Sequence, residues 1–152
     1  MKNLSKTLLA LCLSLLLTNA FAQSKDETAI KTVIEKETSA WFARDAKAME
    51  SCWAKVPQIT QCVSLLGDVV IFNTAESNKG KDPFAEVGSV PQKGDVTRTN
   101  WNFRIVGNGA YVTYTEKDEV AGVVSNFYES RFMEKIDGQW KIVAVNAVAY
   151  KP

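Results

Sequence analysis

The sequence of 152 residues contains no histidine. Histidine is the usual general base near neutral pH and the commonest metal ligand in proteins, so its absence excludes Ser-His-Asp and Cys-His nucleophile schemes. Cysteine is also scarce: there are three, with no Cys-x-x-Cys spacing. Two or three cysteines without histidine do not complete a structural zinc site. We therefore expect no metal and no cofactor.

An excess of either charge is missing as well. The chain has 18 Lys and Arg against 17 Asp and Glu. Because Lys2 and Lys6 are the only charged residues among the first 22, the remainder carries about one net negative charge. Such a balance provides no field that would attract nucleic acid or an anionic membrane. We expect no nucleic-acid partner.

The apolar run at the start of the chain is too short to span a membrane as a helix. Leu8 to Leu17 is ten residues, whereas a spanning helix needs about 20. Lys2 and Lys6 precede the run and Ala20-Phe21-Ala22 follows it, which is the order of a secretory signal peptide. This predicts a signal peptide over residues 1–22 and a periplasmic or extracellular protein with no stable membrane insertion after cleavage. A retained membrane anchor is the alternative.

Export changes the interpretation of the cysteines. After cleavage Cys52 and Cys62 remain, ten residues apart, in a compartment that permits disulfides. A bridge between them requires Cα atoms within about 7 Å. The alternative is two buried free thiols.

The first half of the mature chain favours helices followed by a hairpin. Apolar residues within Asp26–Arg44 and Ala46–Ala54 recur at helical spacing. Two apolar stretches, Ile59–Leu66 and Asp68–Asn73, are typical of a short hairpin. Asp82-Pro83 is typical of a helix cap and first turn.

The second half predicts four long antiparallel strands. They cover 96–106, 110–120, 123–136 and 139–150, with tight turns at Asn108-Gly109, Ala121-Gly122 and Asp137-Gly138. Strands of this length should twist and curve strongly. With the helices before them, they predict one α+β domain over residues 23–152, in which the helices pack on the concave face of a curved antiparallel sheet.

Alternation along the first of these strands assigns its faces. Strict alternation directs Trp101, Phe103 and Ile105 to one face. The same rule directs Arg98, Asn100, Asn102 and Arg104 to the other. We therefore expect the arginines of this strand to point away from its aromatic residues.

Two parts of the chain resemble a known superfamily. The helical segment Trp41-Phe42-Ala43-Arg44-Asp45-Ala46-Lys47-Ala48-Met49 and the stretch Arg131 to Val143, with its Glu-Lys-x-Asp-Gly-x-Trp-Lys-Ile-Val pattern, resemble the nuclear transport factor 2-like superfamily, in particular its SnoaL-like exported members. The resemblance implies a cone-shaped α+β domain with a pocket between helices and sheet, often a homodimer through the outer sheet face. It implies no single activity, because the fold hosts isomerases, cyclases, dehydratases and binding modules.

Six residues are candidates for lining that pocket: Trp53, Tyr114, Tyr128, Glu129, Arg131 and Asn146. Glu129 and Arg131 share one face of a strand, so they can form an ion pair in which Arg131 anchors an anionic ligand group and the pKa of Glu129 is lowered. A purely structural ion pair is the alternative. Tyr128 has the opposite parity and cannot share their face. Asn146, an amide within an apolar strand, needs hydrogen-bond partners from the backbone or a ligand.

Two functions remain open. The first is a protein that binds a small molecule or peptide in the pocket. The second is a cofactor-independent isomerase, cyclase or dehydratase that transfers protons through Glu129, Asp68 or Tyr128. A buried carboxylate with a raised pKa and no cation partner would favour the enzyme. The catalytic residues themselves are not identified by the sequence.

Overall fold

The computed structural model describes residues 25–66, 69–85 and 88–151. A helix over residues 25–43, the amino-terminal helix, precedes α2 (Ala46–Glu50), β1 (Thr60–Leu65), β2 (Val69–Thr74) and α3 (Ala75–Asn78). Four long strands follow: β3 (Gly94–Val106), β4 (Gly109–Val120), β5 (Val123–Ile136) and β6 (Gln139–Tyr150). The predicted signal peptide and Asp68 lie outside the described residues. None of the described helices is both long enough and apolar enough to cross a bilayer.

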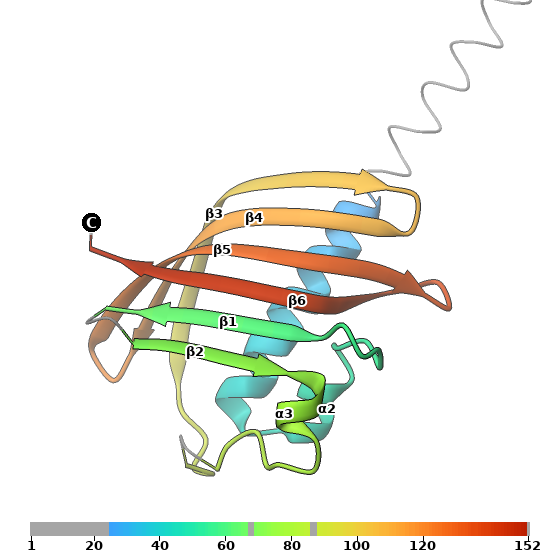
Figure 1. Cartoon of the computed structure of the whole chain (residues 1–152). Coiled ribbons are helices and arrows are strands. Elements are labelled where there is room, and N and C mark those ends of the chain that lie inside the picture. Colours follow the sequence, from blue (N-terminus) through green and yellow to red (C-terminus); the bar gives the residue numbers. More distant parts are fainter. Residues whose placement is uncertain (1–24, 67–68, 86–87, 152) are drawn as a thin grey trace, which may run out of the picture.

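The strands form one six-stranded sheet in the order β2-β1-β6-β5-β4-β3. The β3 to β6 meander and the β1–β2 hairpin are antiparallel, as predicted. β1 runs parallel to β6, so the sheet is mixed and the expectation of an antiparallel sheet was wrong at this one pairing. Figure 1 shows the curved sheet with the amino-terminal helix across one face, which we call the concave face. The α+β architecture is confirmed.

The core lies between the amino-terminal helix and the concave face. Ile30 and Ile34, one helical turn apart, are fully buried, and they pack with Val112 of β4, Met133 of β5 and Ile142 of β6. Full burial of each such side chain stabilises the fold by about 1.5–3 kcal/mol. This apolar stripe fixes the helix on the sheet and therefore positions the polar side chains on either side of it.

Several local elements differ from the expectations. α2 ends at Glu50 rather than Ala54, and residues 83–85 form turns rather than a helix. α3 was not predicted; Thr74 and Ser77 cap it reciprocally. The β3–β4 turn is Gly107-Asn108, with Gly107 at φ 57°, because β4 already begins at Gly109. The other two turns have φ > 0 at both central residues, as type I′ turns require.

A β-bulge at Asn100 changes the faces of β3. Asn100 has φ 56°, and the register advances three residues from Thr99 to Asn102 while β4 advances two, from Thr115 to Thr113. The extra residue reverses the alternation, so the residues before and after the bulge follow opposite parity. Arg98 consequently lies on the concave face with Trp101, and its predicted outward orientation was wrong.

Candidate functional site

The predicted pair Glu129 and Arg131 lies on the concave face and belongs to a larger buried network. Arg131 Nε lies 3.2 Å from Glu129 Oε2, and Arg131 Nη1 lies 3.5 Å from Glu37 Oε2 of the amino-terminal helix. Arg131 Nε also donates to the hydroxyl of Tyr114 at 3.0 Å, and that hydroxyl donates to Glu129 at 3.4 Å. All four residues are buried. The network therefore joins helix, β4 and β5 through charge-assisted contacts.

Burial dominates the electrostatics of this network. It raises the pKa of Glu129 to about 7 although Arg131 opposes the shift, so the expectation of a lowered pKa was wrong. Burial also raises the pKa of Tyr114. For Arg131 burial acts to lower the pKa, but Glu129, Tyr114 and Glu37 outweigh it and the pKa is raised. Because two carboxylates already contact its guanidinium, Arg131 is not free to anchor an anionic ligand.

A second polar cluster adjoins the first on the same face. Arg98 Nε lies 2.6 Å from Glu116 Oε2, an ion-pair contact without hydrogen-bond alignment, and Arg98 Nη2 donates to Thr38 Oγ1 at 2.6 Å. Asp118 Oδ1 is buried with no hydrogen-bond partner among the described residues. Burial, reinforced by neighbouring Glu116, raises the pKa of Asp118 to about 7. Sequence reasoning missed this cluster, although Tyr114, Glu116 and Asp118 share one parity on a strand.

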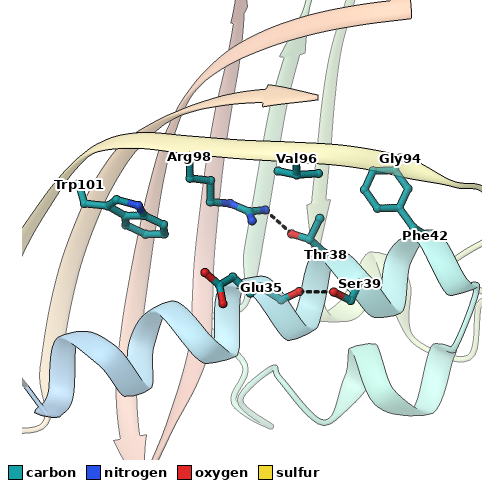
Figure 2. A pocket seen from close by; sticks show the side chains of 8 residues that line it. All are labelled: Glu35, Thr38, Ser39, Phe42, Gly94, Val96, Arg98 and Trp101. Atoms are coloured by element: carbon teal, nitrogen blue, oxygen red, sulfur yellow. Dashed lines mark hydrogen bonds between the residues drawn. The ribbon is translucent and has the colours of Figure 1, made fainter. Parts of the chain in front are cut away.

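A groove of about 350 Å³ opens beside this second cluster, between the amino-terminal helix and β3. We call it the helix–β3 groove; its lining consists of Glu35, Thr38, Ser39, Phe42, Gly94, Val96, Arg98 and Trp101. Figure 2 shows Arg98 and Trp101 projecting from β3 toward the helix that carries Thr38 and Ser39. The Nη1 amino group of Arg98 has no hydrogen-bond partner in the described part of the chain. The groove thus combines a nearly buried cation with aromatic and hydroxyl groups.

A larger groove of about 540 Å³ lies on another side of the same helix, against the β5–β6 hairpin. We call it the lysine groove, because Lys25, Lys36, Lys135 and Lys141 line it. Asp26, Ala29, Thr32, Val33, Ser51, Cys52, Gly138, Gln139 and Trp140 complete its walls. Sequence reasoning assigned none of these residues to a pocket, because they come from three separate segments.

Two predicted pocket residues lie on the outer face instead. Tyr128 is 57% exposed and stacks on Tyr150 at a centroid distance of 4.3 Å. Asn146 is exposed, and its amide donates to Ser130 Oγ at 3.3 Å across the β5–β6 pair. Both alternate with buried neighbours, which places them away from the concave face. Neither residue reaches the pocket that we expected it to line.

Tyr114 lies on the concave face but lines neither groove, and Trp53 packs at the edge of the core. Trp53 forms a parallel bridge with Ile142, and it lines neither groove. Tyr114 contributes its ring as well as its hydroxyl, because it packs on Trp101 at a centroid distance of 4.3 Å.

Of the two alternatives for the cysteines, the disulfide is not formed. Cys52 and Cys62 are both free thiols. Cys52 is buried in the core under the concave face, whereas Cys62 is in register with outer-face Asn146, so the sheet separates the two sulfurs. Within residues 25–66, 69–85 and 88–151, no three Cys, Asp or Glu side chains are grouped so that they could hold a metal ion.

No protein-family model and no curated protein matches the chain. Solved structures do. An NTF2-like protein from Cytophaga hutchinsonii has a TM-score of 0.62 at 15% identity over 82% of this chain and 98% of that one. One from Methylobacillus flagellatus has a TM-score of 0.61 at 22% identity, covering 84% and 94%. A proposed dehydratase of the NTF2-like family from Streptomyces avermitilis has a TM-score of 0.65 at 16% identity, covering 86% and 99%. The chain therefore has the NTF2-like fold.

Proposed function

We propose that this protein binds a small molecule in the helix–β3 groove. The observation that supports the proposal is Arg98, whose side chain is 8% exposed and borders the groove, while its Nη1 amino group has no protein partner in the described residues. Nη1 is not among the buried atoms of Arg98, so it is open to the groove and can donate a hydrogen bond to a ligand. A volume of about 350 Å³ is within the range of small-ligand pockets, about 300–1,000 Å³.

The lining defines the chemistry of the ligand. Phe42, Val96 and Trp101 provide apolar contact, Thr38 and Ser39 add hydroxyls, of which that of Thr38 accepts from Arg98, and Glu35 adds a carboxylate. A compact ligand with an apolar ring and a carboxylate or carbonyl oxygen would satisfy both sides. The oxygen would accept from Arg98 Nη1, and the ring would lie against the aromatic wall.

Benzoate and benzamide test the proposal, because they share a ring and differ in charge. The four tryptophans provide indole N–H signals in NMR spectra, and Trp101 lies in this groove whereas Trp140 lies in the other. Saturable binding that shifts the Trp101 signal and is tighter for benzoate is expected. Ser39→Phe fills the groove and should abolish the shift, whereas Ala43→Phe, at an exposed helix position outside both grooves, should not. A Trp101 signal that neither compound moves contradicts the proposal.

A second candidate function, cofactor-independent proton transfer, is supported by Asp118. Its Oδ1 is buried without a hydrogen-bond partner in the described residues, its pKa is raised to about 7, and its register partner Val96 lines the helix–β3 groove. A carboxylate poised near neutral pH is suited to general-base catalysis. The fold of the Streptomyces avermitilis protein named above is compatible with this chemistry.

Deuterium exchange separates the two functions. Incubation of cyclic ketones with the protein in D₂O should label their α-carbons if Asp118 acts as a base, and Asp118→Asn should stop the labelling. Wild-type protein that binds benzoate but exchanges no α-proton supports binding alone.

We also propose that the chain is exported and cleaved after Ala22, since the order of charge, apolar run and small residues in residues 1–22 favours it. The intact mass of exported protein should correspond to a chain that starts at Gln23. A membrane-bound form that keeps Leu8–Leu17 would contradict this.

A further inference from the structure

We propose that the lysine groove is a second binding site, for an anion carried on a short apolar chain, with a carboxylate or phosphate as its headgroup. Four lysines and one aspartate line the groove, in a chain whose overall charge is near zero. The positive charge is therefore concentrated locally. This proposal is independent of the helix–β3 groove, because no residue lines both.

Lys36 and Lys141 share one neutral partner and have no counter-ion among the described residues. Lys36 Nζ donates to Ser51 Oγ at 2.9 Å and Lys141 Nζ donates to the Ser51 carbonyl at 2.7 Å, so both ammonium groups meet at one neutral residue. Neither forms an ion pair within the described part of the chain. Lys135 does, at 2.6 Å from Asp26. Two like charges held close together repel each other, and a bound anion would remove that cost.

Helix capping accounts for only one of the two contacts. Ser51 is the C-cap of α2, and a cation near the end of a helix is favourable, which explains Lys141 on the Ser51 carbonyl. Lys36 contacts only the Ser51 hydroxyl, which already donates to the Ala48 carbonyl at 2.6 Å. The Lys36 ammonium group therefore contributes little to the cap, and it is better placed to bind an anion.

The walls of the groove favour an anion with an apolar body over a free inorganic ion. Ala29, Val33, Cys52 and Trp140 give it an apolar lining. The indole of Trp140 is fixed by its hydrogen bond to Asp26 at 3.0 Å, and Lys135 lies over its ring at 5.4 Å. A headgroup near Lys36 and Lys141 would leave a short chain to lie along this lining. A volume of about 540 Å³ accommodates such a molecule.

Decanoate, its uncharged analogue decanol and inorganic phosphate form the test. Isothermal titration of the full mature chain with decanoate at low salt should show saturable 1:1 binding that weakens as salt rises. The Trp140 indole signal should shift while that of Trp101 stays in place. Lys36→Gln/Lys141→Gln should weaken binding at least tenfold. The matched control Lys79→Gln/Lys117→Gln removes two exposed lysines outside both grooves and should bind as wild type does.

Three results would overturn the proposal: no saturable decanoate binding, equal affinity in the Lys36→Gln/Lys141→Gln variant, or equal affinity for decanol. Phosphate binding as tight as that of decanoate would also overturn it, because the site would then hold an adventitious ion only. Far-ultraviolet circular dichroism of both double variants confirms that they are folded. A failure here leaves the benzoate experiment unaffected, since that experiment reads Trp101.

Discussion

Arg131 holds together three acceptors that would otherwise be buried without a cation. Glu129, Glu37 and the Tyr114 hydroxyl all contact its guanidinium. Removing one partner of a buried ion pair typically costs about 3–5 kcal/mol, because the other charge is left uncompensated. We expect Arg131→Ala to lower the free energy of unfolding by about that amount, measured by urea denaturation.

Benzoate affinity should change little in Arg131→Ala under conditions where that variant is folded, since Arg131 does not line the helix–β3 groove. Arg104→Ala is the matched control. Its side chain lies on the exposed outer face of β3, where substitutions usually change stability by no more than about 0.5 kcal/mol. Equal effects of the two substitutions would show that the buried network does not stabilise the fold.

Asp118 should make stability depend on pH in an unusual direction. Its pKa is raised from the ordinary value of 3.8 to about 7 in the folded chain. Between those values the folded protein holds a proton that the unfolded chain has lost, so the contribution of Asp118 to stability falls as the pH rises from about 4 to about 7. Glu129, with its pKa also raised to about 7, adds to the same trend.

The asparagine of Asp118→Asn cannot ionise. The unfolding free energy of this variant should therefore fall less steeply between pH 5 and pH 8 than that of wild type. Urea denaturation at pH 5, 6, 7 and 8 measures this slope. The exposed Asp95→Asn serves as the control and should keep the wild-type slope. A slope unchanged in Asp118→Asn would mean that its carboxyl does not titrate in this range.

At the residue scale, the alternation rule predicted part of the candidate site. It correctly placed Glu129 and Arg131 together and Tyr128 on the opposite face. It could not find Glu37, because a contact between the amino-terminal helix and β5 spans 94 positions and leaves no local pattern. It also gave the wrong direction for the pKa of Glu129, since the degree of burial follows from the helix that covers the strand.

Among the elements, the junction between the amino-terminal helix and β3 depends on Gly94. A Cβ at this position would lie 2.9 Å from Phe42 Cζ and 3.1 Å from Val120 Cγ2. Gly94→Ala therefore forces the phenyl ring, which lines the helix–β3 groove, to move. We expect a loss of about 1–3 kcal/mol in unfolding free energy, as for other overpacked sites, together with a change in the Trp101 indole signal.

Gly109→Ala is the corresponding control at the start of β4, where a Cβ would meet only the Val106 carbonyl at an ordinary 3.7 Å. It should leave both the stability, to within about 1 kcal/mol, and the Trp101 signal unchanged. If Gly94→Ala also changes neither quantity, the Phe42 ring can move aside without a measurable cost, and the junction between the helix and β3 is less tightly packed than these distances indicate.

The elements themselves were predictable to different degrees. The four long strands were found because alternation and tight-turn residues are local signals, and their limits differ by at most two residues from those expected. The parallel pairing of β1 with β6 joins segments about 80 residues apart and has no such signal. The bulge at Asn100 was missed because a single residue with φ > 0 does not interrupt the apolar alternation that follows it.

On the scale of the whole molecule, we propose that the chain forms a homodimer through the outer face of the sheet, as the family resemblance implies. Its exposed apolar side chains come from β2, β4, β5 and β6: Val70, Phe72, Tyr111, Tyr128, Phe132 and Val148. The positions between them are uncharged, including Cys62, Thr113, Ser130 and Asn146. Interface cores are depleted of charge, and a two-fold dimer requires a face that meets itself without like-charge contacts.

Phe132→Glu places a charge near the middle of this face and should convert a dimer into a monomer in sedimentation-velocity measurements. Val90→Glu, which alters an exposed loop residue, should leave the dimer intact. A wild-type chain that sediments as a monomer at high concentration would contradict the proposal of a homodimer.

The extra residue at Asn100 makes the chemistry of the helix–β3 groove conditional on the length of one strand. Without it, the stretch before Trp101 would turn over as a unit, and Thr97 and Thr99 would occupy the face on which Arg98 now lies. A single insertion or deletion, with no substitution at all, thus exchanges a guanidinium for two hydroxyls. One insertion or deletion in this strand would therefore change the charge of the groove.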